Sequence, residues 1–259
     1  MDIRAYNREA WNRQVESGEN PWTQPVGPDV IARARQGDWS VLLTEQTPVP
    51  RSWFPPDLRG LNILALACGG GQQGPIFAAA GANVTVLDNS PRQLERDQMV
   101  AAREGLTNLR TVEGDARDLS AFEDASFDLV FNPVSTCFIP EVRPIWRECF
   151  RVLRPGGVLM TGFMNPVMYI FDLFEMDEGR LVVKYSVPYT DAGSLPPADL
   201  EKLLNLGWPL EHSHTLTDQI AGQTDAGFHI VGLYEDQKAN MLLGRYHPLY
   251  IATRAIKPG

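Results

Sequence analysis

The stretch from Leu61 to Asp88 constrains the fold of this chain most strongly. The apolar run 61–67 is long enough for a buried parallel strand and too short for a core helix. Three glycines follow at 69–71, and the residues 73–80 are typical of a helix with proline in its first turn. Gly81 ends that helix, and a second apolar strand ends at Asp88. The stretch therefore predicts one βαβ unit.

The glycine turn also predicts a binding site. Its N–H groups and the positive end of the following helix suit a polar or anionic cofactor. Asp88 comes about 20 residues after the glycines, where a carboxylate holds the ribose of a bound nucleotide. The alternative is that Asp88 only caps the helix that begins near Ser90 and Pro91.

Charge and length limit the possible partners. The chain has 259 residues, enough for one domain with an insertion, and carries 23 basic against 32 acidic residues, a net charge of −9. The sequence contains no cluster of Lys and Arg, so we expect no nucleic-acid partner. No apolar run approaches the roughly 18 residues that a membrane span requires, so we expect no membrane partner.

The cysteines indicate a reducing compartment. Cys68, Cys137 and Cys149 are odd in number and form no CxxC motif. No histidine stands at metal-ligand spacing from them, so we expect no metal site. The start of the chain lacks the apolar segment of a signal peptide, and we therefore expect a cytoplasmic protein.

An N-terminal helical cap is predicted over residues 1–56. Apolar residues recur at helical spacing over 3–17, and a second short helix begins at Pro28. Four of the tryptophans precede the βαβ unit, which is consistent with a cap over a site or with simple packing of this segment on the domain. The proline-rich segment 48–56 predicts the boundary to the core domain.

Strands and helices alternate through the rest of the core, residues 57–164. We predict a helix over 90–103, strands over 109–112 and 127–131, a helix over 143–153 and a strand over 158–162. This alternation predicts an α/β fold with a doubly wound, parallel sheet. An insertion follows over 165–210, with a helix over 165–174, a strand over 181–187 and a helix over 196–206. It is expected to face the substrate as a lid.

Five sequence runs carry a resemblance to a known family. They are LALACGGG, VTVLDNSPRQL, VEGDARDL, FDLVFNPV and FRVLRPGGVLM, in this order between residues 61 and 163. Their order and spacing resemble the class I S-adenosylmethionine-dependent methyltransferases. The resemblance implies S-adenosylmethionine as cofactor and a Rossmann-like fold with seven mostly parallel strands. The last part of the core, 211–259, would complete the sheet with a helix over 217–226 and strands over 228–234 and 250–255.

The resemblance also implies roles for particular residues. The backbone at Ala67, Cys68 and Gly69 would contact the methionine part of the cofactor, and Asp88 would hold both ribose hydroxyls. The remaining cofactor-binding residues would be Gly71 and Gln73 in the glycine turn and the helix start, Asn89, Gln93, Asp115 and Ala116 around the adenine, and Asn132 and Pro133 beside the sulfonium.

Two positions depart from the family pattern. Ala65 stands where relatives usually have an acidic residue, and Ala67 stands where they have glycine. The missing carboxylate leaves open how the amino group of the cofactor is held, and Gln72 or Gln73 could serve as polar partners.

His212 and His214 are the candidate catalytic bases. They alternate, so on an extended segment both would face one side, and imidazole titrates near neutral pH. The alternative is that each is bonded to nearby backbone. Cys137, Asp218, Gln219 and Gln223 are further candidates for the acceptor pocket.

We expect methyl transfer to a small-molecule acceptor with an O, N, S or C nucleophile. Two alternatives remain: a non-catalytic protein that binds S-adenosylmethionine or S-adenosylhomocysteine, and a nicotinamide-dependent oxidoreductase. The sequence predicts neither the acceptor nor the oligomeric state.

Overall fold

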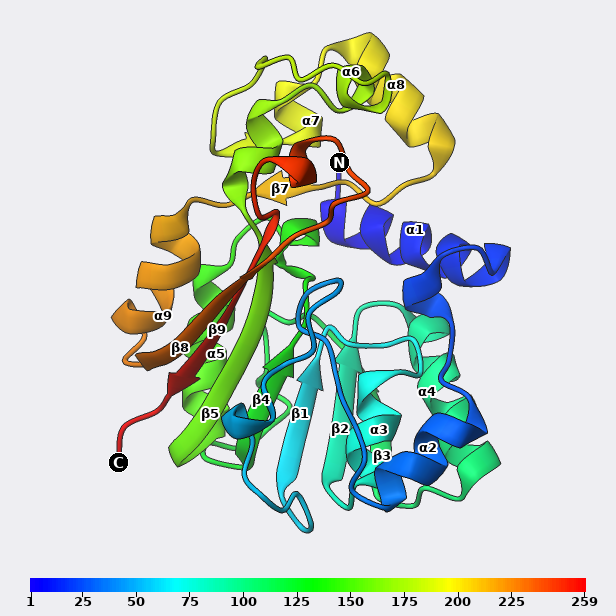
Figure 1. The fold of residues 1–259 in the computed structure, drawn as a ribbon, viewed down its shortest axis with the longest axis vertical. Coiled ribbons are helices and arrows are strands. Elements are labelled where there is room, and N and C mark those ends of the chain that lie inside the picture. The colour runs from blue at the N-terminus through cyan, green and yellow to red at the C-terminus, as the bar shows by residue number, and fades with distance from the viewer.

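A seven-stranded sheet forms the centre of the protein. The computed structural model describes all 259 residues, and the strand order is β3-β2-β1-β4-β5-β9-β8 (Figure 1). The strands from β3 to β5 run parallel, whereas β9 is antiparallel to both β5 and β8. The predicted seven-stranded, mostly parallel sheet is confirmed. The strand bounds are β1 Asn62–Leu66, β2 Asn83–Asp88, β3 Leu109–Glu113, β4 Phe127–Asn132, β5 Leu153–Met164, β8 His229–Asp236 and β9 Tyr250–Ile256.

Helices cover both faces of the sheet. Ile63 and Ala65 of β1 point into a cluster with α2, α3 and α4, while Leu64 and Leu66 point into a second cluster with α5. This alternation explains why β1 is apolar from Ile63 to Leu66, because a strand between two helical layers has no polar face. The helix bounds are α2 Pro28–Arg35, α3 Gln73–Ala79, α4 Pro91–Glu104, α5 Arg143–Val152 and α9 Gly222–Asp225.

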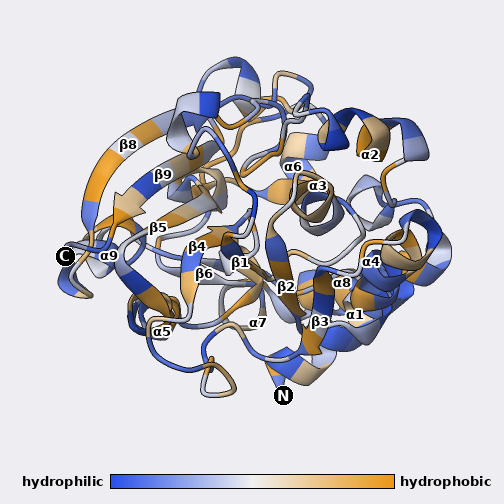
Figure 2. Cartoon of the chain, turned by 90° about the horizontal axis from the view of Figure 1, so that it is seen from below, coloured by the Kyte–Doolittle hydropathy of each residue, from blue (hydrophilic) through white to orange (hydrophobic).

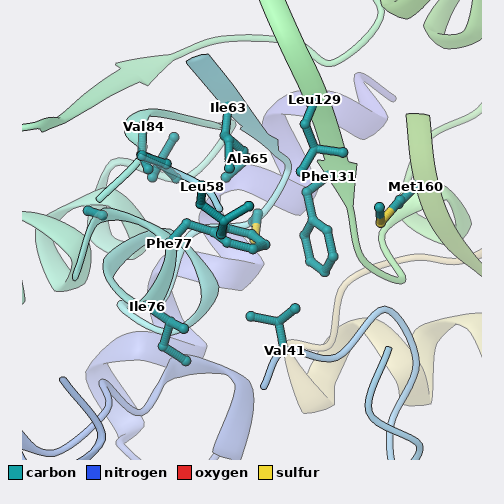
Figure 3. Close-up of a cluster of buried hydrophobic side chains, with 14 of the residues drawn as sticks. Val41, Leu58, Ile63, Ala65, Ile76, Phe77, Val84, Leu129, Phe131 and Met160 are labelled. Atoms are coloured by element: carbon teal, nitrogen blue, oxygen red, sulfur yellow. The ribbon is translucent and has the colours of Figure 1, made fainter. Parts of the chain in front are cut away.

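The larger core cluster includes residues that precede the first strand. Val41 and Leu58 pack beside Phe77 of α3 and Phe131 of β4 (Figure 3). The rings of Phe77 and Phe131 meet edge to face, with centroids 5.0 Å apart. Within the proline-rich segment, Val49 and Phe54 are buried in the same cluster. That segment therefore contributes to the core as well as connecting to it.

Apolar and polar residues are distributed as expected for a sheet that is enclosed by two layers of helices. Figure 2 shows apolar residues concentrated on the inner strands and hydrophilic residues on the outer faces of helices such as α4. None of the helices combines the length and the apolar character that crossing a bilayer requires.

The N-terminal helix and the insertion lie over the carboxyl ends of the parallel strands (Figure 1). Asn7 of α1, Ile3–Ser17, joins them: its side-chain amide donates to Phe138 O and Leu210 O, both at 2.9 Å, and accepts from Leu210 N at 2.8 Å. The insertion contains α6 Leu173–Asp177, α7 Asp191–Ser194, α8 Pro197–Leu206 and a short ladder of β6 Tyr189–Thr190 with β7 His212–Ser213.

Several predicted elements of the insertion were wrong. The helix over 165–174 is a 3-10 helix, Pro166–Ile170, followed by α6, because the Asp172 side chain accepts from Phe174 N and Glu175 N and starts a new helix. The strand over 181–187 does not form, and only Val183 makes a single bridge, to Phe171. Its apolar residues 181–183 are exposed, so no core face stabilises a strand there.

The helix over 217–226 was predicted as one α-helix. It begins as a π-helix, Thr217–Ala221, and continues as α9.

Candidate active site

One cavity of about 660 Å³ opens at the carboxyl ends of the parallel strands. It lies between the sheet, α1 and the insertion, and its wall includes the glycine turn after β1 and the loop after β4. β1 and β4 are the neighbours between which the strand order reverses, which is where open α/β sheets bind ligands.

The glycine turn approaches its neighbours too closely to carry side chains. A Cβ on Gly70 would lie 2.4 Å from Trp22 O, and one on Gly69 would lie 2.6 Å from the Cβ of Gln93. Gly70 N–H donates to Gln93 O at 3.1 Å and to the buried Asp97 Oδ2 at 3.0 Å. These contacts fix the turn from behind and leave its other side facing the cavity. The role of Asp97 was not predicted from the sequence.

Asp88 lies in the cavity wall beside this turn. Its Oδ2 accepts from Gly69 N and its Oδ1 from Ser90 N, both at 2.9 Å. Burial raises the pKa of the Asp88 carboxyl, although the backbone donors oppose this shift. A carboxylate offers about four acceptor positions, so two remain for hydroxyl groups of a ligand. The N-cap of α4 is Ser90, whose Oγ accepts from Gln93 N.

Asp115 and Ala116 form the neighbouring part of the wall. Arg117 binds the Asp115 carboxylate with two nitrogens, the shorter contact being 2.7 Å. Burial favours a higher pKa for Asp115, but the hydrogen bonds and charge of Arg117 lower the pKa overall. Arg4 of α1 lies 3.7 Å from the same carboxylate and exchanges two hydrogen bonds with Asn89. The N-terminal helix therefore closes this end of the cavity.

Most of the predicted cofactor-binding residues line the cavity, and two do not. Those in the wall are Ala67, Cys68, Gly69, Gln73, Asp88, Asn89, Gln93, Asp115, Ala116 and Pro133. Gly71 instead accepts from Val26 N, and a Cβ there would lie 2.8 Å from Arg96 O. Asn132 is fully buried and bonds to Leu66 O, Ser135 and Thr161. Gly71 and Asn132 therefore stabilise loops behind the cavity wall and do not line it.

The structure does not bring His212 and His214 to the cavity wall. Their rings stack with centroids 6.5 Å apart. His214 Nε2 lies 3.1 Å from Thr136 O and 2.9 Å from Ile139 O, so this nitrogen carries a proton that it donates to backbone carbonyls. Burial, together with the charge of His214, lowers the pKa of His212 to about 4. The contacts of His214 match the structural alternative, whereas the buried Nε2 of His212 has no hydrogen-bond partner within the chain.

Of the second-rank candidates, Cys137 lines the cavity and the others do not. Burial raises the pKa of the Cys137 thiol well above its usual value. Asp218 pairs with Arg143, Gln219 donates to Thr136 Oγ1, and Gln223 bridges Gln219 O and Thr253. Trp11 lines the cavity, whereas Tyr6 does not and instead donates to the carbonyl of the lining residue Trp208.

The far end of the cavity holds polar residues that sequence reasoning missed. Glu45 binds Lys238 Nζ at 2.6 Å and accepts from Tyr250 OH. Glu211 accepts from Tyr169 OH at 2.7 Å. Burial raises the pKa of Glu211 to about 7. These five residues come from five separate segments and belong to no motif, so only the folded chain brings them together.

The apolar wall of this end is rich in sulfur. Met164, Met168 and Met241 line it together with Val134 and Cys137. Flexible thioethers adapt to irregular ligand shapes. Within the chain, no group of three or more histidine, cysteine or acidic residues is arranged to hold a metal ion.

Comparisons with known proteins agree with this geometry. A sequence family described as a methyltransferase domain matches residues 64–161. The chain is 49% identical over 253 residues to a Bacillus subtilis protein named "Uncharacterized methyltransferase YbaJ", covering 98% of each chain. A sterol 24-C-methyltransferase of Gibberella zeae is 43% identical over 101 residues, which are 38% of this chain and 26% of that protein.

Solved structures show the same fold. An S-adenosylmethionine-dependent methyltransferase from Mesorhizobium loti aligns with a TM-score of 0.62 at 20% identity, over 80% of this chain and 94% of that chain. A putative S-adenosylmethionine-dependent methyltransferase from Listeria monocytogenes aligns with a TM-score of 0.59 at 20% identity, over 88% and 100%.

The residues at the cavity fit the cofactor of these proteins. The glycine turn, which lines the cavity with Gly69, and the two free acceptor positions of Asp88 suit a ribose and the adjoining sulfonium chain. Together with the long match to the Bacillus protein, this shows that the chain belongs to the class I S-adenosylmethionine-dependent methyltransferases.

Proposed function

We propose that this protein transfers the methyl group of S-adenosylmethionine to a small-molecule acceptor bound in the same cavity. The observation that carries the proposal is the shape of the cavity. It extends past the glycine turn into the methionine-lined end near Glu211, and residues of α1 and of the insertion line it as well. Pockets of roughly 300–1,000 Å³ hold ligands of drug size, and the cavity of about 660 Å³ falls in this range, which supports a small acceptor beside the cofactor.

The residues of the chain would hold and orient the two ligands. Asp88 would accept from the ribose hydroxyls, and Asp115 and Ala116 would border the adenine. S-adenosylmethionine supplies an electrophilic methyl group on its sulfonium. The chain excludes water and aligns the acceptor, which are the main contributions that a protein makes to such a displacement.

The sterol methyltransferases match only part of this chain and less than half of their own length. The 43% match spans only about a quarter of that protein and 38% of this chain. The acceptor-end residues Glu211, Lys238 and Tyr250 come after the 64–161 stretch that matches the methyltransferase-domain family. We therefore base the acceptor on the cavity and not on those names.

Calorimetric titration tests the proposal first at the cofactor. We expect S-adenosylmethionine and S-adenosylhomocysteine to bind, and NADH to bind far more weakly. Incubation with labelled S-adenosylmethionine and a panel of small nucleophiles should then yield S-adenosylhomocysteine and a labelled product. Tighter binding of NADH would overturn the cofactor assignment. Cofactor binding with no transfer to any acceptor class would favour the non-catalytic alternative.

A further inference from the structure

The carboxylates of Glu45 and Glu211, at the acceptor end of the cavity, differ in their ion pairs and hydrogen bonds. Glu45 has a counter-charge, because Lys238 Nζ lies 2.6 Å from its carboxylate, and Tyr250 OH donates to it as well. Glu211 forms no ion pair. It receives a single hydrogen bond, from Tyr169 OH to Oε2 at 2.7 Å. Its Oε1 has no partner within the chain and belongs to a residue that lines the cavity.

Three other carboxylates accept more hydrogen bonds than Glu211, and the buried Asp97, whose Oδ1 also lacks a partner, does not line the cavity. Asp88 accepts from two backbone N–H groups, and Asp236 accepts from two backbone N–H groups and a hydroxyl. Asp191, beside Glu211 on the insertion, accepts from Glu211 N and Tyr189 OH. A buried carboxylate without such partners is costly unless a ligand completes its shell. Glu211 is therefore placed to receive a hydrogen-bond donor from the cavity.

The charged residues at the acceptor end of the cavity favour a cationic ligand over an anionic one. Its one cation, Lys238, is already engaged by Glu45, so an anionic acceptor would find no free counter-charge. A cationic donor would neutralise Glu211, while the thioethers of Met164 and Met168 would cover an apolar body.

We infer that Glu211 takes a proton from the acceptor, and that the acceptor is an amine with an apolar body. This inference rests on the proposed methyl transfer. An amine enters as an ammonium ion, whose N–H bond breaks with both electrons remaining on nitrogen, and Glu211 Oε1 gains the proton. The nitrogen lone pair so exposed forms the new N–C bond, while the S–C bond breaks with its electron pair going to sulfur. The methylated nitrogen carries the positive charge, and Glu211 releases its proton to water.

The surroundings of Glu211 suit proton transfer near neutral pH. Burial is the largest cause of its pKa of about 7, with the Asp191 charge acting in the same direction and Tyr169 and Lys238 opposing it. A base with a pKa near the working pH is the most effective. The titratable groups that face it from the surrounding elements are Tyr169, Asp191, Lys238, Cys137, Tyr189 and Tyr250.

A binding experiment tests the inference without requiring turnover. The protein loaded with S-adenosylhomocysteine is titrated with naphthylmethylamine, naphthalenemethanol and naphthoate, which share one apolar body. We expect the amine to bind roughly tenfold or more tightly than the alcohol, and the carboxylate to bind weakest. In Glu211→Gln the preference for the amine should disappear, whereas the exposed control Glu235→Gln should keep it.

Measurements of turnover are the second test of the inference. With S-adenosylmethionine and the amine, kcat of the wild type should rise with pH through about 7, since only the ionised Glu211 accepts a proton. Glu211→Gln should lower kcat roughly a hundredfold or more and remove this pH dependence, and Glu211→Asp should restore part of both. Affinity for S-adenosylmethionine should be unchanged, which shows that the variants are folded.

Several outcomes would overturn the inference. They are an amine preference that survives in Glu211→Gln, binding of the alcohol or the carboxylate as tight as that of the amine, or no binding of any of the three to protein that holds S-adenosylhomocysteine. A loss of S-adenosylmethionine affinity in Glu211→Gln would assign Glu211 to the cofactor instead. Failure of wild-type protein to bind S-adenosylmethionine would contradict the proposed function itself.

Discussion

The Asp88 carboxylate lies against the backbone of Gly69. Its Oδ2 accepts the Gly69 N–H at 2.9 Å, and a Cβ on residue 69 would lie 3.1 Å from that same oxygen. The carboxylate that is expected to hold the ribose therefore also holds the turn beneath the cofactor.

Asp88→Asn should weaken S-adenosylmethionine binding by about 1.5–3 kcal/mol, because an amide loses half of the acceptor positions of a carboxylate. Calorimetric titration measures the change, and Asp29→Asn on the exposed surface of α2 is the control. Full affinity in Asp88→Asn would mean that the ribose is held elsewhere.

Ala67 has a φ of +46°, in the left-handed region that costs an L-residue about 1–2 kcal/mol. Ala67→Gly removes that cost but gives the unfolded chain more entropy, about 0.4–1 kcal/mol. We expect a gain in the free energy of unfolding of up to about 1 kcal/mol. Ala67→Val should lose more than that amount, because β-branched residues tolerate this region worst.

Urea unfolding of the two Ala67 variants gives the answer. A clear loss of stability in Ala67→Gly would show that the methyl group of Ala67 makes packing contacts that outweigh the backbone strain.

Glu211 should make stability depend on pH. Its pKa is raised from 4.5 to about 7 in the folded protein, so the folded state binds more protons than the unfolded state between these values. The free energy of unfolding therefore falls as pH rises through this interval. Glu211→Gln removes the effect, and at pH near 8 it should be more stable than wild type by about 3 kcal/mol, with the difference vanishing towards pH near 4.

Denaturant unfolding across this pH range tests the sign. Glu148→Gln is a control with the opposite sign, because hydrogen bonds from Arg151 lower the pKa of Glu148. Removal of the Glu148 carboxylate should therefore not stabilise the protein at high pH. A wild type that gains stability from Glu211 as pH rises would contradict the environment described for this residue.

His214 distinguishes a structural from a catalytic histidine. Its Nε2 serves two carbonyls of the loop after β4, so His214→Ala should lower the free energy of unfolding by about 1–3 kcal/mol. S-adenosylmethionine affinity and the kcat of folded protein should change less than fivefold. A large loss of kcat with unchanged stability would return His214 to the mechanism.

The cofactor end was predictable from sequence because it is local. The glycines, Asp88 and Asp115 each follow a strand of the same parallel sheet, and adjacent strands bring their ends together without knowledge of distant packing. Gly71 and Asn132 lie in the same motifs but face the opposite way. Motif membership does not show which side of a turn faces the cavity.

The acceptor end was not predictable because it is assembled over long sequence distances. Tyr250 OH donates a hydrogen bond to Glu45, and Tyr169 OH donates one to Glu211. In each pair the two residues lie far apart in the sequence. Alternating Leu, Val and Tyr residues indicated a strand over 181–187, but a strand also needs a partner and a buried face. At that position the only pairing is the single bridge from Val183 to Phe171, and the residues 181–183 are exposed.

A crystal structure with S-adenosylhomocysteine and naphthylmethylamine tests the central claim most directly. We predict the ribose hydroxyls on Asp88, the adenine beside Asp115 and Ala116, and the amine nitrogen within hydrogen-bond distance of Glu211. A cofactor whose amino group occupies Glu211, or whose ribose lies away from Asp88, would contradict the account.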